Sequence, residues 1–340
     1  MFTNVQEAEK ISAYSYIKET LLESKKLDFE DLALQVFQIQ AEHNPIYAQW
    51  LKLLGKSPSA VRQLEDIPFL PIDFFKSKRL SIFKEEPNYF FQSSGTGGYG
   101  QSKHAVYSEV LYDSITDQGF EAFYGPIKDF TVLALLPAYL ERKGSSLVRM
   151  ADRFIKASAD EDSGFFLNDY AALAELLARK KQEGRKVLLL GVSFALWDLA
   201  EAFPQDLSGT LIMETGGMKG RRKELLRQDL HAILKEAFKV EAIHSEYGMT
   251  ELFSQAYSKG EGLFKATDTL RVFVREMEDP FSWARVGKSG GLNLIDLANL
   301  DSCAFIETQD LGRKFEDGSF EILGRFDRAE VRGCNLMIGG

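Results

Sequence analysis

Residues 91–103 read FQSSGTGGYGQSK, a run of glycines and hydroxyl side chains between two patterned segments. The run follows a strand-like segment at Tyr89–Phe91 and precedes a helical pattern over Ser108–Tyr124. Glycines allow backbone N–H groups to converge, and hydroxyls add further donors, so such a loop can surround phosphate oxygens. We predict a phosphate-binding loop here, and a surface loop of the same composition is the alternative.

This loop supplies the first set of candidate site residues. The expected phosphate ligands are Ser93, Ser94, Gly95, Thr96, Gly97 and Gly98. Lys103 would add a positive charge where the loop ends. The spacing G-x-x-x-x-G-K-[ST] is absent, so a P-loop NTPase is disfavoured.

A second motif reads YGMTE at residues 247–251. An aromatic ring beside a glycine can lie flat on a purine, and Thr250 can reach a phosphate. The Glu251 carboxylate suits Mg²⁺, a hard ion that prefers oxygen ligands. An ordinary turn leading into a helix is the alternative interpretation. The other candidate nucleotide-binding residues of this motif are Tyr247, Gly248 and Met249.

A third motif reads TQDLGR at residues 308–313 and is followed by GRFD at residues 324–327. Asp310 can accept hydrogen bonds from two ribose hydroxyls. Arg325 can contact ribose or phosphate through its planar set of donors. A pair of β-turns is the alternative, which we accept for Asp317-Gly318 because Asp-Gly favours tight hairpin turns.

The composition is that of an ordinary globular enzyme, with 45% hydrophobic and 27% charged residues among 340. The net charge of −9 argues against a broad nucleic-acid-binding face, which would need clustered Lys and Arg. No stretch approaches the roughly 18 consecutive apolar residues of a membrane span. The acidic N-terminus has no secretory core, so we expect a cytoplasmic protein in which Cys303 and Cys334 are free thiols.

The order of the apolar runs predicts an α/β fold, with a mostly parallel sheet covered by helices and a smaller β-rich subdomain. We expect a helical segment over residues 1–65, an α/β nucleotide-binding core over 66–262, and the β-rich subdomain with a C-terminal tail over 263–340. The strands expected in the core are Tyr89–Phe91, Phe130–Leu136, Val187–Leu190 and Leu211–Met213. The helices expected between them are Ser108–Tyr124, Tyr170–Glu183, Ser193–Ala202 and Arg221–Phe238.

In this order and at these separations, the three motifs resemble those of the adenylate-forming superfamily, which includes acyl-CoA ligases, luciferases and peptide-synthetase adenylation domains. Gly216 and Gly217, just after the strand Leu211–Met213, resemble the adenine-side glycine segment of that superfamily and join the candidate nucleotide ligands. The resemblance covers roughly residues 65–335. It implies the large N-terminal domain of such an enzyme, with ATP and Mg²⁺ as cofactors and a small carboxylic acid as substrate.

Within this superfamily the sequence is most similar to the acyl-protein synthetases of bacterial luminescence, the fatty-acid–protein ligases, and next to the phenylacetate-CoA ligases. In those synthetases a cysteine near the C-terminus accepts the activated acyl group, and Cys334 matches that position. The proline usual before the loop lysine is missing, and Lys103 lies later than in the superfamily pattern. The sequence ends at Gly340, so we expect the usual mobile C-terminal domain to be absent.

The resemblance leaves three functions open. The first is ATP-dependent activation of a fatty acid, with transfer of the acyl group to Cys334 and onward to an acyl-accepting protein or a reductase subunit. The second is an acyl-CoA ligase of the phenylacetate-CoA ligase type, which would not need Cys334. The third is a non-catalytic nucleotide-binding or scaffolding subunit. In either enzyme Lys103 and Thr250 would stabilise the phosphates during the reaction, and Glu251 would hold Mg²⁺.

Overall fold

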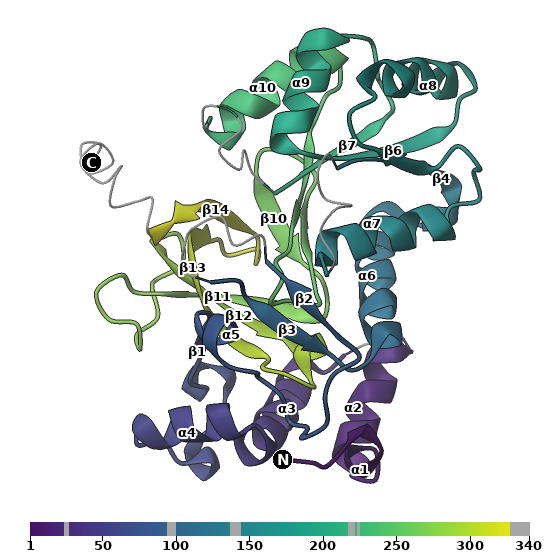
Figure 1. Cartoon of the computed structure of the whole chain (residues 1–340). Helices are drawn as coiled ribbons and strands as arrows, with labels where there is room; N and C mark the ends of the chain where they lie inside the picture. The colour runs from purple at the N-terminus through teal and green to yellow at the C-terminus, as the bar shows by residue number, and fades with distance from the viewer. Residues whose placement is uncertain (24–26, 94–99, 137–143, 217–221, 223–224, 327–340) are drawn as a thin grey trace.

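The computed structural model describes residues 1–23, 27–93, 100–136, 144–216, 222 and 225–326 (Figure 1). Their largest element is a twelve-stranded sheet in the order β11-β12-β13-β14-β10-β9-β8-β7-β6-β4-β5, with β1 beside β13. A separate two-stranded sheet joins β2 and β3. No helix in the described part of the chain is both long enough and apolar enough to span a membrane.

The elements have the following bounds. The α-helices are α1 (Val5–Ala8), α2 (Ser12–Leu22), α3 (Phe29–His43), α4 (Pro45–Leu53), α5 (Phe74–Ser77), α6 (Glu109–Tyr124), α7 (Ser146–Ala157), α8 (Tyr170–Gln182), α9 (Ser193–Ala202) and α10 (Arg227–Phe238). The strands up to β7 are β1 (Leu70–Pro71), β2 (Tyr89–Gln92), β3 (Lys103–Val106), β4 (Phe130–Leu135), β5 (Gly164–Phe166), β6 (Lys186–Val192) and β7 (Leu211–Thr215). The later strands are β8 (His244–Tyr247), β9 (Ala256–Ser258), β10 (Leu263–Ala266), β11 (Leu270–Arg275), β12 (Ser289–Asp296), β13 (Phe305–Lys314) and β14 (Phe320–Arg325).

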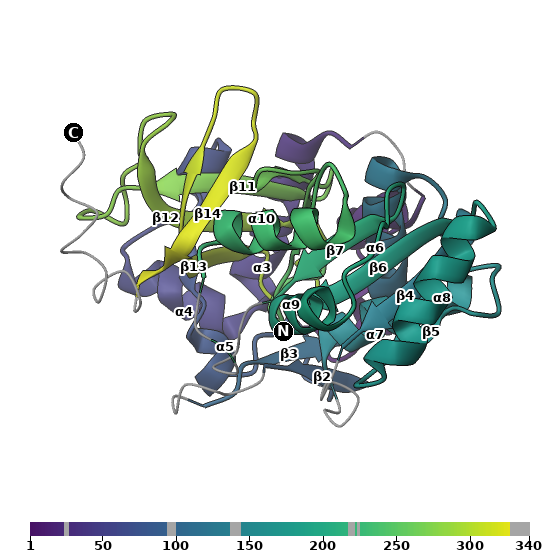
Figure 2. The same ribbon diagram turned by 90° about the horizontal axis from the view of Figure 1, so that it is seen from above.

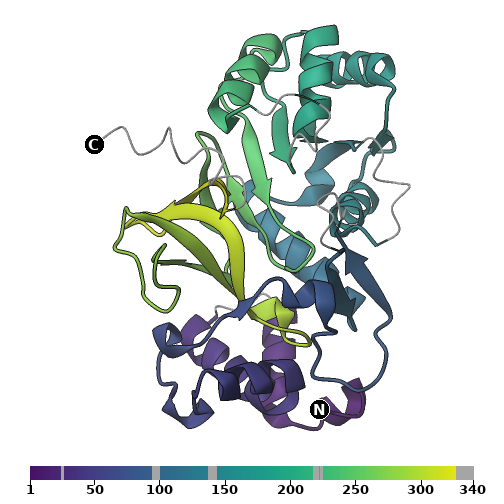
Figure 3. The ribbon, with the colours of Figure 1, turned by 60° about the vertical axis from the view of Figure 1, so that its left-hand side comes forward.

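One half of the large sheet is parallel. Strands β5, β4, β6, β7 and β8 pair in parallel. Every residue of β4 is buried, as expected for a strand covered on both faces. Helix α7 lies against β4, and α8 and α9 lie against β6, while α8, α9 and α10 gather at one end of the molecule (Figures 1 and 3). The predicted α/β fold, with a parallel sheet covered by helices, is confirmed.

The other half of the sheet is antiparallel and forms the predicted β-rich region. It joins the parallel half without a break, because β8 pairs antiparallel with β9 and β9 with β10. Seen from above, β11 to β14 extend away from the helices that cover the parallel strands (Figure 2). The predicted division between residues 262 and 263 falls between β9 and β10, which pair across it, and that division stays a prediction.

Buried polar side chains attach the N-terminal helices to the antiparallel half. Gln40 of α3 donates to the carbonyl oxygens of Asn299 (2.9 Å) and Leu300 (3.0 Å), and its own side-chain oxygen accepts from the Ala304 N–H at 2.9 Å. Gln40 is fully buried, so these bonds satisfy backbone groups that water cannot reach. Helices α1 to α4 therefore share one hydrophobic core with strands from the far end of the chain.

The strand expected at Tyr89–Phe91 is present, but the prediction that it belongs to the parallel sheet is wrong. It forms β2 and pairs antiparallel with β3, with Phe91 opposite His104 and Gln92 opposite Lys103. In the sequence the glycine-rich run separates β2 from β3. The two strands run in opposite directions and pair with each other. Strand β3 was not expected from the sequence.

The expected start of the helix at Arg221 is also wrong. Helix α10 begins at Arg227, six residues later. Arg222 lies outside the helix with its guanidinium 4.4 Å from the centroid of the Trp197 ring, and it pairs with Glu201 at 2.8 Å. These contacts bind Arg222 to α9, which accounts for its position outside α10.

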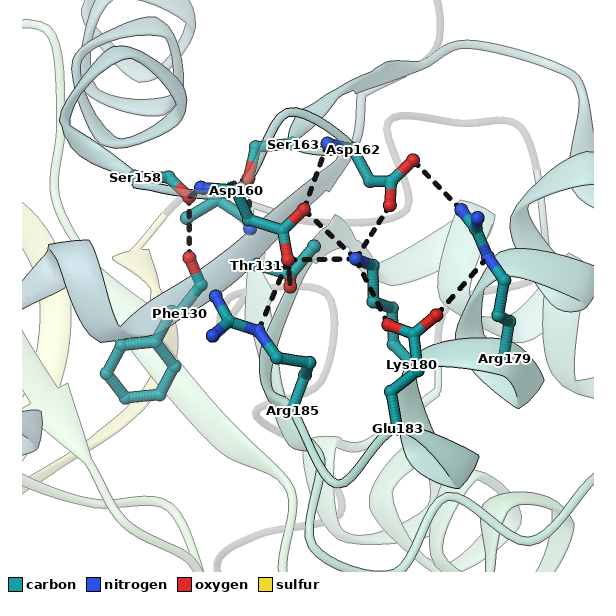
Figure 4. Close-up of polar contacts among 11 residues, drawn as sticks. Phe130, Thr131, Ser158, Asp160, Asp162, Ser163, Arg179, Lys180, Glu183 and Arg185 are labelled. Carbon is teal, nitrogen blue, oxygen red and sulfur yellow. Dashed lines mark hydrogen bonds and ion pairs between the residues drawn. The ribbon is translucent and has the colours of Figure 1, made fainter.

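An ionic network fixes the amino-terminal end of the parallel half (Figure 4). Lys180 of α8 is only 5% exposed, and its Nζ lies 2.9 Å from Asp160 Oδ2, 2.6 Å from Asp162 and 3.4 Å from Glu183. Thr131, the second residue of β4, donates to Asp160 at 2.6 Å. Burial raises the pKa of Asp160, but the hydrogen bonds from Thr131 and Lys180 outweigh it and hold that pKa well below its usual range. The network thus holds a buried, ionised carboxylate between α8 and β4.

We expect Lys180→Met to lower the free energy of unfolding by about 3–5 kcal/mol, because it leaves Asp160 charged and without its main cation. The matched control is Lys181→Met on the same helix. Lys181 pairs with Asp206 near the surface, so its loss should cost less than about 1 kcal/mol. Urea unfolding at pH 7 measures both. Equal small losses would show that the network does not stabilise the fold.

Candidate functional site

The candidate site lies along the edge where the parallel strands end. Ser193 follows β6, Gly216 follows β7 and Gly248 follows β8, so three chain turns meet at the carboxyl edge of neighbouring strands. This edge is where open α/β sheets generally bind ligands. Gly216 has a positive φ of 69°, which glycine adopts without strain, and its carbonyl oxygen accepts a hydrogen bond from the Ser193 hydroxyl at 3.4 Å. Gly217 lies outside the described residues.

The base of the glycine-rich loop is closed by two serines. The Ser93 N–H donates to the Ser102 carbonyl oxygen at 3.1 Å, and the Ser102 N–H donates to the Ser93 hydroxyl at 2.9 Å. Lys103 follows directly as the exposed first residue of β3. The other predicted phosphate ligands lie outside the described residues: Ser94, Gly95, Thr96, Gly97 and Gly98.

The second and third motifs meet at Asp310. The Tyr247 hydroxyl donates to Asp310 Oδ2 at 2.7 Å. Asp310 and Arg325 face each other across β13 and β14, with Arg325 Nε 3.9 Å from Asp310 Oδ1. Arg325 also donates to the Gln309 side-chain oxygen at 2.9 Å. Burial, together with the charge of Asp310, raises the pKa of Tyr247 far above its ordinary value, so the phenol stays a neutral donor that orients the carboxylate.

Glu251 connects this pair to the glycine-rich loop. Its side chain is buried, and burial raises its pKa, while the nearby Ser102 side chain and the charge of Arg325 oppose that rise. Ser102 belongs to the loop base and Arg325 to the third motif, so parts of all three sequence motifs lie near Glu251.

The donor set around Glu251 fits a magnesium ion held mainly by phosphates. The described residues contain no group of three or more His, Cys, Asp or Glu placed to hold a metal. Mg²⁺, however, is commonly held by one or two carboxylates and by substrate phosphates. Glu251 would supply that single carboxylate, beside the loop expected to bind phosphate.

A buried histidine that the sequence analysis missed holds Thr250. His104 of β3 has Nδ1 3.1 Å from the Thr250 carbonyl oxygen and Nε2 2.7 Å from the Ser302 hydroxyl. Burial lowers the pKa of His104 to about 4, so the ring is neutral at pH 7. A neutral ring that donates from Nδ1 to the carbonyl accepts from the Ser302 hydroxyl at Nε2. His104 therefore links the strand after the glycine-rich loop to the second motif.

Two further buried residues, also missed, hold the chain just after Thr250. Asn299 donates to the Glu251 carbonyl oxygen at 2.7 Å. Asp296 Oδ2 accepts from the N–H groups of Phe253 (2.8 Å) and Ser254 (2.9 Å). Because Asp296 and Asn299 are 0% and 1% exposed, these bonds fix the backbone on which Glu251 is carried.

Another missed group is a pair of acidic residues at the ends of β7 and β8. Thr215 donates to Glu246 Oε2, and the pKa of Glu246 is raised to about 7 by burial and by the nearby charge of Glu214. Glu214 accepts from Ser193 and has His231 Nε2 3.7 Å from Oε2. Glu246 of β8 is thus bonded to the last residue of β7, directly before Gly216.

The sequence does contain a signal for these missed residues. Glu214 and Glu246 each lie at the end of a strand, in LIMET and HSEY. Asp296 and Asn299 interrupt an apolar run, LNLIDLANL. A polar residue inside such a run is expected to be hydrogen-bonded, because burial without a partner is costly.

Of the two cysteines, the structure describes only Cys303. Cys303 is fully buried, its Sγ lies 3.6 Å from the Phe305 carbonyl oxygen, and burial raises the pKa of its thiol to about 12. Cys303 is a free thiol, as expected, and burial keeps it in its neutral form. Cys334 lies outside the described residues.

The close approach of Glu246 to Gly248 yields a test. A Cβ on Gly248 would overlap Glu246 Oε1, so Gly248→Ala should lower the free energy of unfolding by about 1–3 kcal/mol. In a Glu246→Ala background the obstructing oxygen is gone and the same change should cost at least about 1 kcal/mol less. Urea unfolding of the four proteins gives this coupling. Equal losses in both backgrounds would show that Glu246 does not pack over Gly248.

Comparison with known proteins identifies solved structures that share this fold. No protein-family model and no curated protein matches the sequence. Among solved structures, 2-hydroxyisobutyryl-CoA ligase in the postadenylation state with 2-HIB-AMP matches with a TM-score of 0.64 at 14% identity, over 92% of this chain and 68% of that one. ATP-bound MatB from Rhodopseudomonas palustris matches with a TM-score of 0.52 at 17% identity, over 69% of this chain. The match spans about half, 47%, of the MatB chain. The described chain thus shares its fold with a large part of these two ligases.

Proposed function

We propose that the protein activates a carboxylic acid with ATP, forming an acyl-adenylate and releasing pyrophosphate. The observation that supports this most strongly is the convergence of the loop base at Ser102, the carboxylate of Glu251 and the pair Asp310 and Arg325. Phosphate-binding, metal-binding and ribose-binding groups are what such a reaction requires at one position. The 2-hydroxyisobutyryl-CoA ligase structure, which has this fold, contains an acyl-AMP.

In this reaction a carboxylate oxygen of the acid attacks the α-phosphorus of ATP, and the bond to the bridging oxygen of pyrophosphate breaks. Asp310, oriented by Tyr247, would accept hydrogen bonds from the ribose hydroxyls. Ser93 and its loop, with Lys103, would bind the departing phosphates, and Thr250 would donate to the reacting one. Donors fixed before the reaction stabilise the charge that develops on the phosphate oxygens. His104 and Asn299 would keep Thr250 and Glu251 in place.

Glu251 would hold Mg²⁺ against the nucleotide. When bound, the ion would neutralise part of the phosphate charge and orient the leaving pyrophosphate. The chain's own contribution is a buried carboxylate near Ser102, on a backbone that the Asn299 hydrogen bond fixes.

The second step would transfer the acyl group to a thiol. By the resemblance to acyl-protein synthetases, the acid would be a fatty acid and Cys334 the acceptor. Its thiolate would attack the acyl carbonyl carbon, and AMP would leave. The acyl group would then pass to an acyl-accepting protein or a reductase subunit. The alternative, transfer to coenzyme A, is favoured by one observation, which is that the 2-hydroxyisobutyryl-CoA ligase of the same fold is a CoA ligase.

Nucleotide binding can be tested by thermal unfolding. ATP with Mg²⁺ should raise the melting temperature, because a ligand that binds only the folded state stabilises it. Asp310→Ala should reduce that rise by at least half, since it removes the ribose acceptor. Each variant is compared with itself without ATP, so any loss of intrinsic stability cancels. Asp317→Ala, in the turn between the same two strands, is the control and should keep the full rise. An unchanged rise in Asp310→Ala would place the nucleotide elsewhere.

The acyl acceptor can be identified by labelling. Incubation with ATP, Mg²⁺ and a labelled fatty acid should give a protein adduct that hydroxylamine releases. Cys334→Ser should abolish the adduct and keep pyrophosphate release, whereas Cys303→Ala, which removes the buried thiol without burying a hydroxyl, should keep both. Acylation of coenzyme A with no protein adduct would instead establish the CoA ligase. Absence of pyrophosphate release with any acid would leave the non-catalytic subunit.

A further inference from the structure

A buried arginine reaches across the antiparallel half of the sheet toward the strand of Asp310. Arg275 is the last residue of β11, is 5% exposed and pairs with Gly291 of β12. A Cβ on Gly291 would overlap the Arg275 guanidinium, so the arginine can lie over β12 only because residue 291 is glycine. The guanidinium thereby contacts β13, which carries Asp310.

The pairing of β12 with β13 is irregular where the guanidinium lies. Gly291 and Asn293 each have a partner on β13, but Leu292 between them faces residues 308–310 together. This is a β-bulge, in which extra residues of one strand disrupt the ladder of hydrogen bonds. Bulges are common next to active sites, where they redirect a side chain. Asp310 is the last residue of this bulge.

Side chains replace the strand hydrogen bonds that the bulge interrupts. Arg275 donates through Nη2 to the Thr308 carbonyl oxygen at 2.8 Å. Through Nη1 it donates to the Leu292 carbonyl oxygen at 3.1 Å and to Asn293 Oδ1 at 2.7 Å. The Thr308 hydroxyl donates to the same Leu292 carbonyl oxygen at 2.7 Å and accepts from the Asp310 N–H at 3.1 Å. Because buried backbone groups need partners, these bonds fix the path of the chain into Asp310.

Arg275 also brings a positive charge to the bulge. Its Nη2 lies 3.7 Å from Glu307 Oε1, and its guanidinium carbon lies 5.2 Å from the centroid of the Phe326 ring. Burial lowers the pKa of Arg275, and the negative charges of Glu307 and Asp310 oppose that change. Arginine keeps its proton in proteins, so the Asp310 carboxylate has a permanent cation within range.

We infer that Arg275 is a positioning residue for the nucleotide ribose: it holds the bulge at residues 308–310, and the bulge directs the Asp310 carboxylate toward the ribose hydroxyls. Tyr247 orients that carboxylate from β8, whereas Arg275 fixes from β11 the backbone that carries it. The inference rests on the proposed adenylation, in which Asp310 accepts from the ribose. It makes Arg275 act on the nucleotide through Asp310 alone.

Binding of ATP and of 2′,3′-dideoxyATP, each with Mg²⁺ and without acid, measures the contribution of the ribose hydroxyls without turnover. In isothermal titration calorimetry the wild-type chain should prefer ATP by at least about tenfold, because hydrogen bonds to a charged acceptor are strong. Arg275→Met should reduce this preference to less than about threefold, since Asp310 is no longer held in position. A wild-type preference in Arg275→Met would overturn the inference.

Further variants separate this role from a general loss of stability. Arg271→Met is the matched control, because Arg271 lies on the same strand but its guanidinium stacks over the Phe29 ring at 4.4 Å. It should keep the full preference for ATP. Arg275→Lys, which keeps the charge and some of the donors, should give an intermediate preference. If Arg275→Met does not fold, Thr308→Val decides: it removes the hydroxyl bond to Asp310, and a full preference there would overturn the inference.

A double-variant cycle tests whether Arg275 acts through Asp310. Arg275→Met should weaken ATP binding by at least about fivefold in the wild-type background and by less than about twofold in an Asp310→Ala background, because the two residues then share one effect. Equal losses in both backgrounds would show that Arg275 acts on the nucleotide by another route and would overturn the inference.

Hydrogen exchange without nucleotide separates this inference from the proposed function. A peptide that contains residues 308–312 should exchange at least about tenfold faster in Arg275→Met than in the wild type, and at the wild-type rate in Arg271→Met. Faster exchange in Arg275→Met, with no ATP binding by the wild-type chain, would keep Arg275 as the residue that holds the bulge and overturn the adenylation. Acid-dependent pyrophosphate release, with unchanged exchange and unchanged ribose preference in Arg275→Met, would keep the adenylation and overturn the inference.

Discussion

The carboxylate of Asp296 and the amide of Asn299 hold the chain where the parallel half of the sheet turns into the antiparallel half. They bind the backbone groups of residues 251–254, which leave β8 at the candidate site and enter β9. Without these bonds, buried N–H and C=O groups would have no partner, at a cost of about 1–3 kcal/mol each. The position of Glu251, and through it the meeting of the three motifs, depends on this constraint.

The same constraint explains how the parallel and antiparallel halves of the sheet form one site. The parallel half supplies turns at its carboxyl edge, and the antiparallel half supplies Asp310 and Arg325 on neighbouring strands. Tyr247 crosses the junction by donating to Asp310 from the end of β8. The hairpin of β2 and β3 completes the arrangement, since His104 binds the Thr250 carbonyl oxygen and Ser102 lies near Glu251. Asp310 is therefore held from both β8 and β14.

The motifs and the fold class could be predicted from the sequence because they are local patterns. A glycine-rich run, an aromatic-glycine pair and an apolar segment can each be recognised within a short stretch of consecutive residues. The pairing of β2 with β3 and the bond from Asp296 to Phe253 could not, because they join segments that no local periodicity relates. His104 was missed for the same reason: its partners, Thr250 and Ser302, lie about 150 and 200 residues away. The roles of the candidate site residues stay predictions.

The bonds from Gln40 to residues 299–304 have a consequence for how the chain is made. The partners are separated by 264 positions, from Gln40 to Ala304. At a synthesis rate of about 5–20 residues per second, the third helix leaves the ribosome roughly 13–50 s before its partner exists. Until then the apolar face of α3, with Leu32, Val36 and Phe37, has no sheet to cover it. The first helices must therefore be shielded by one another or by a chaperone during synthesis.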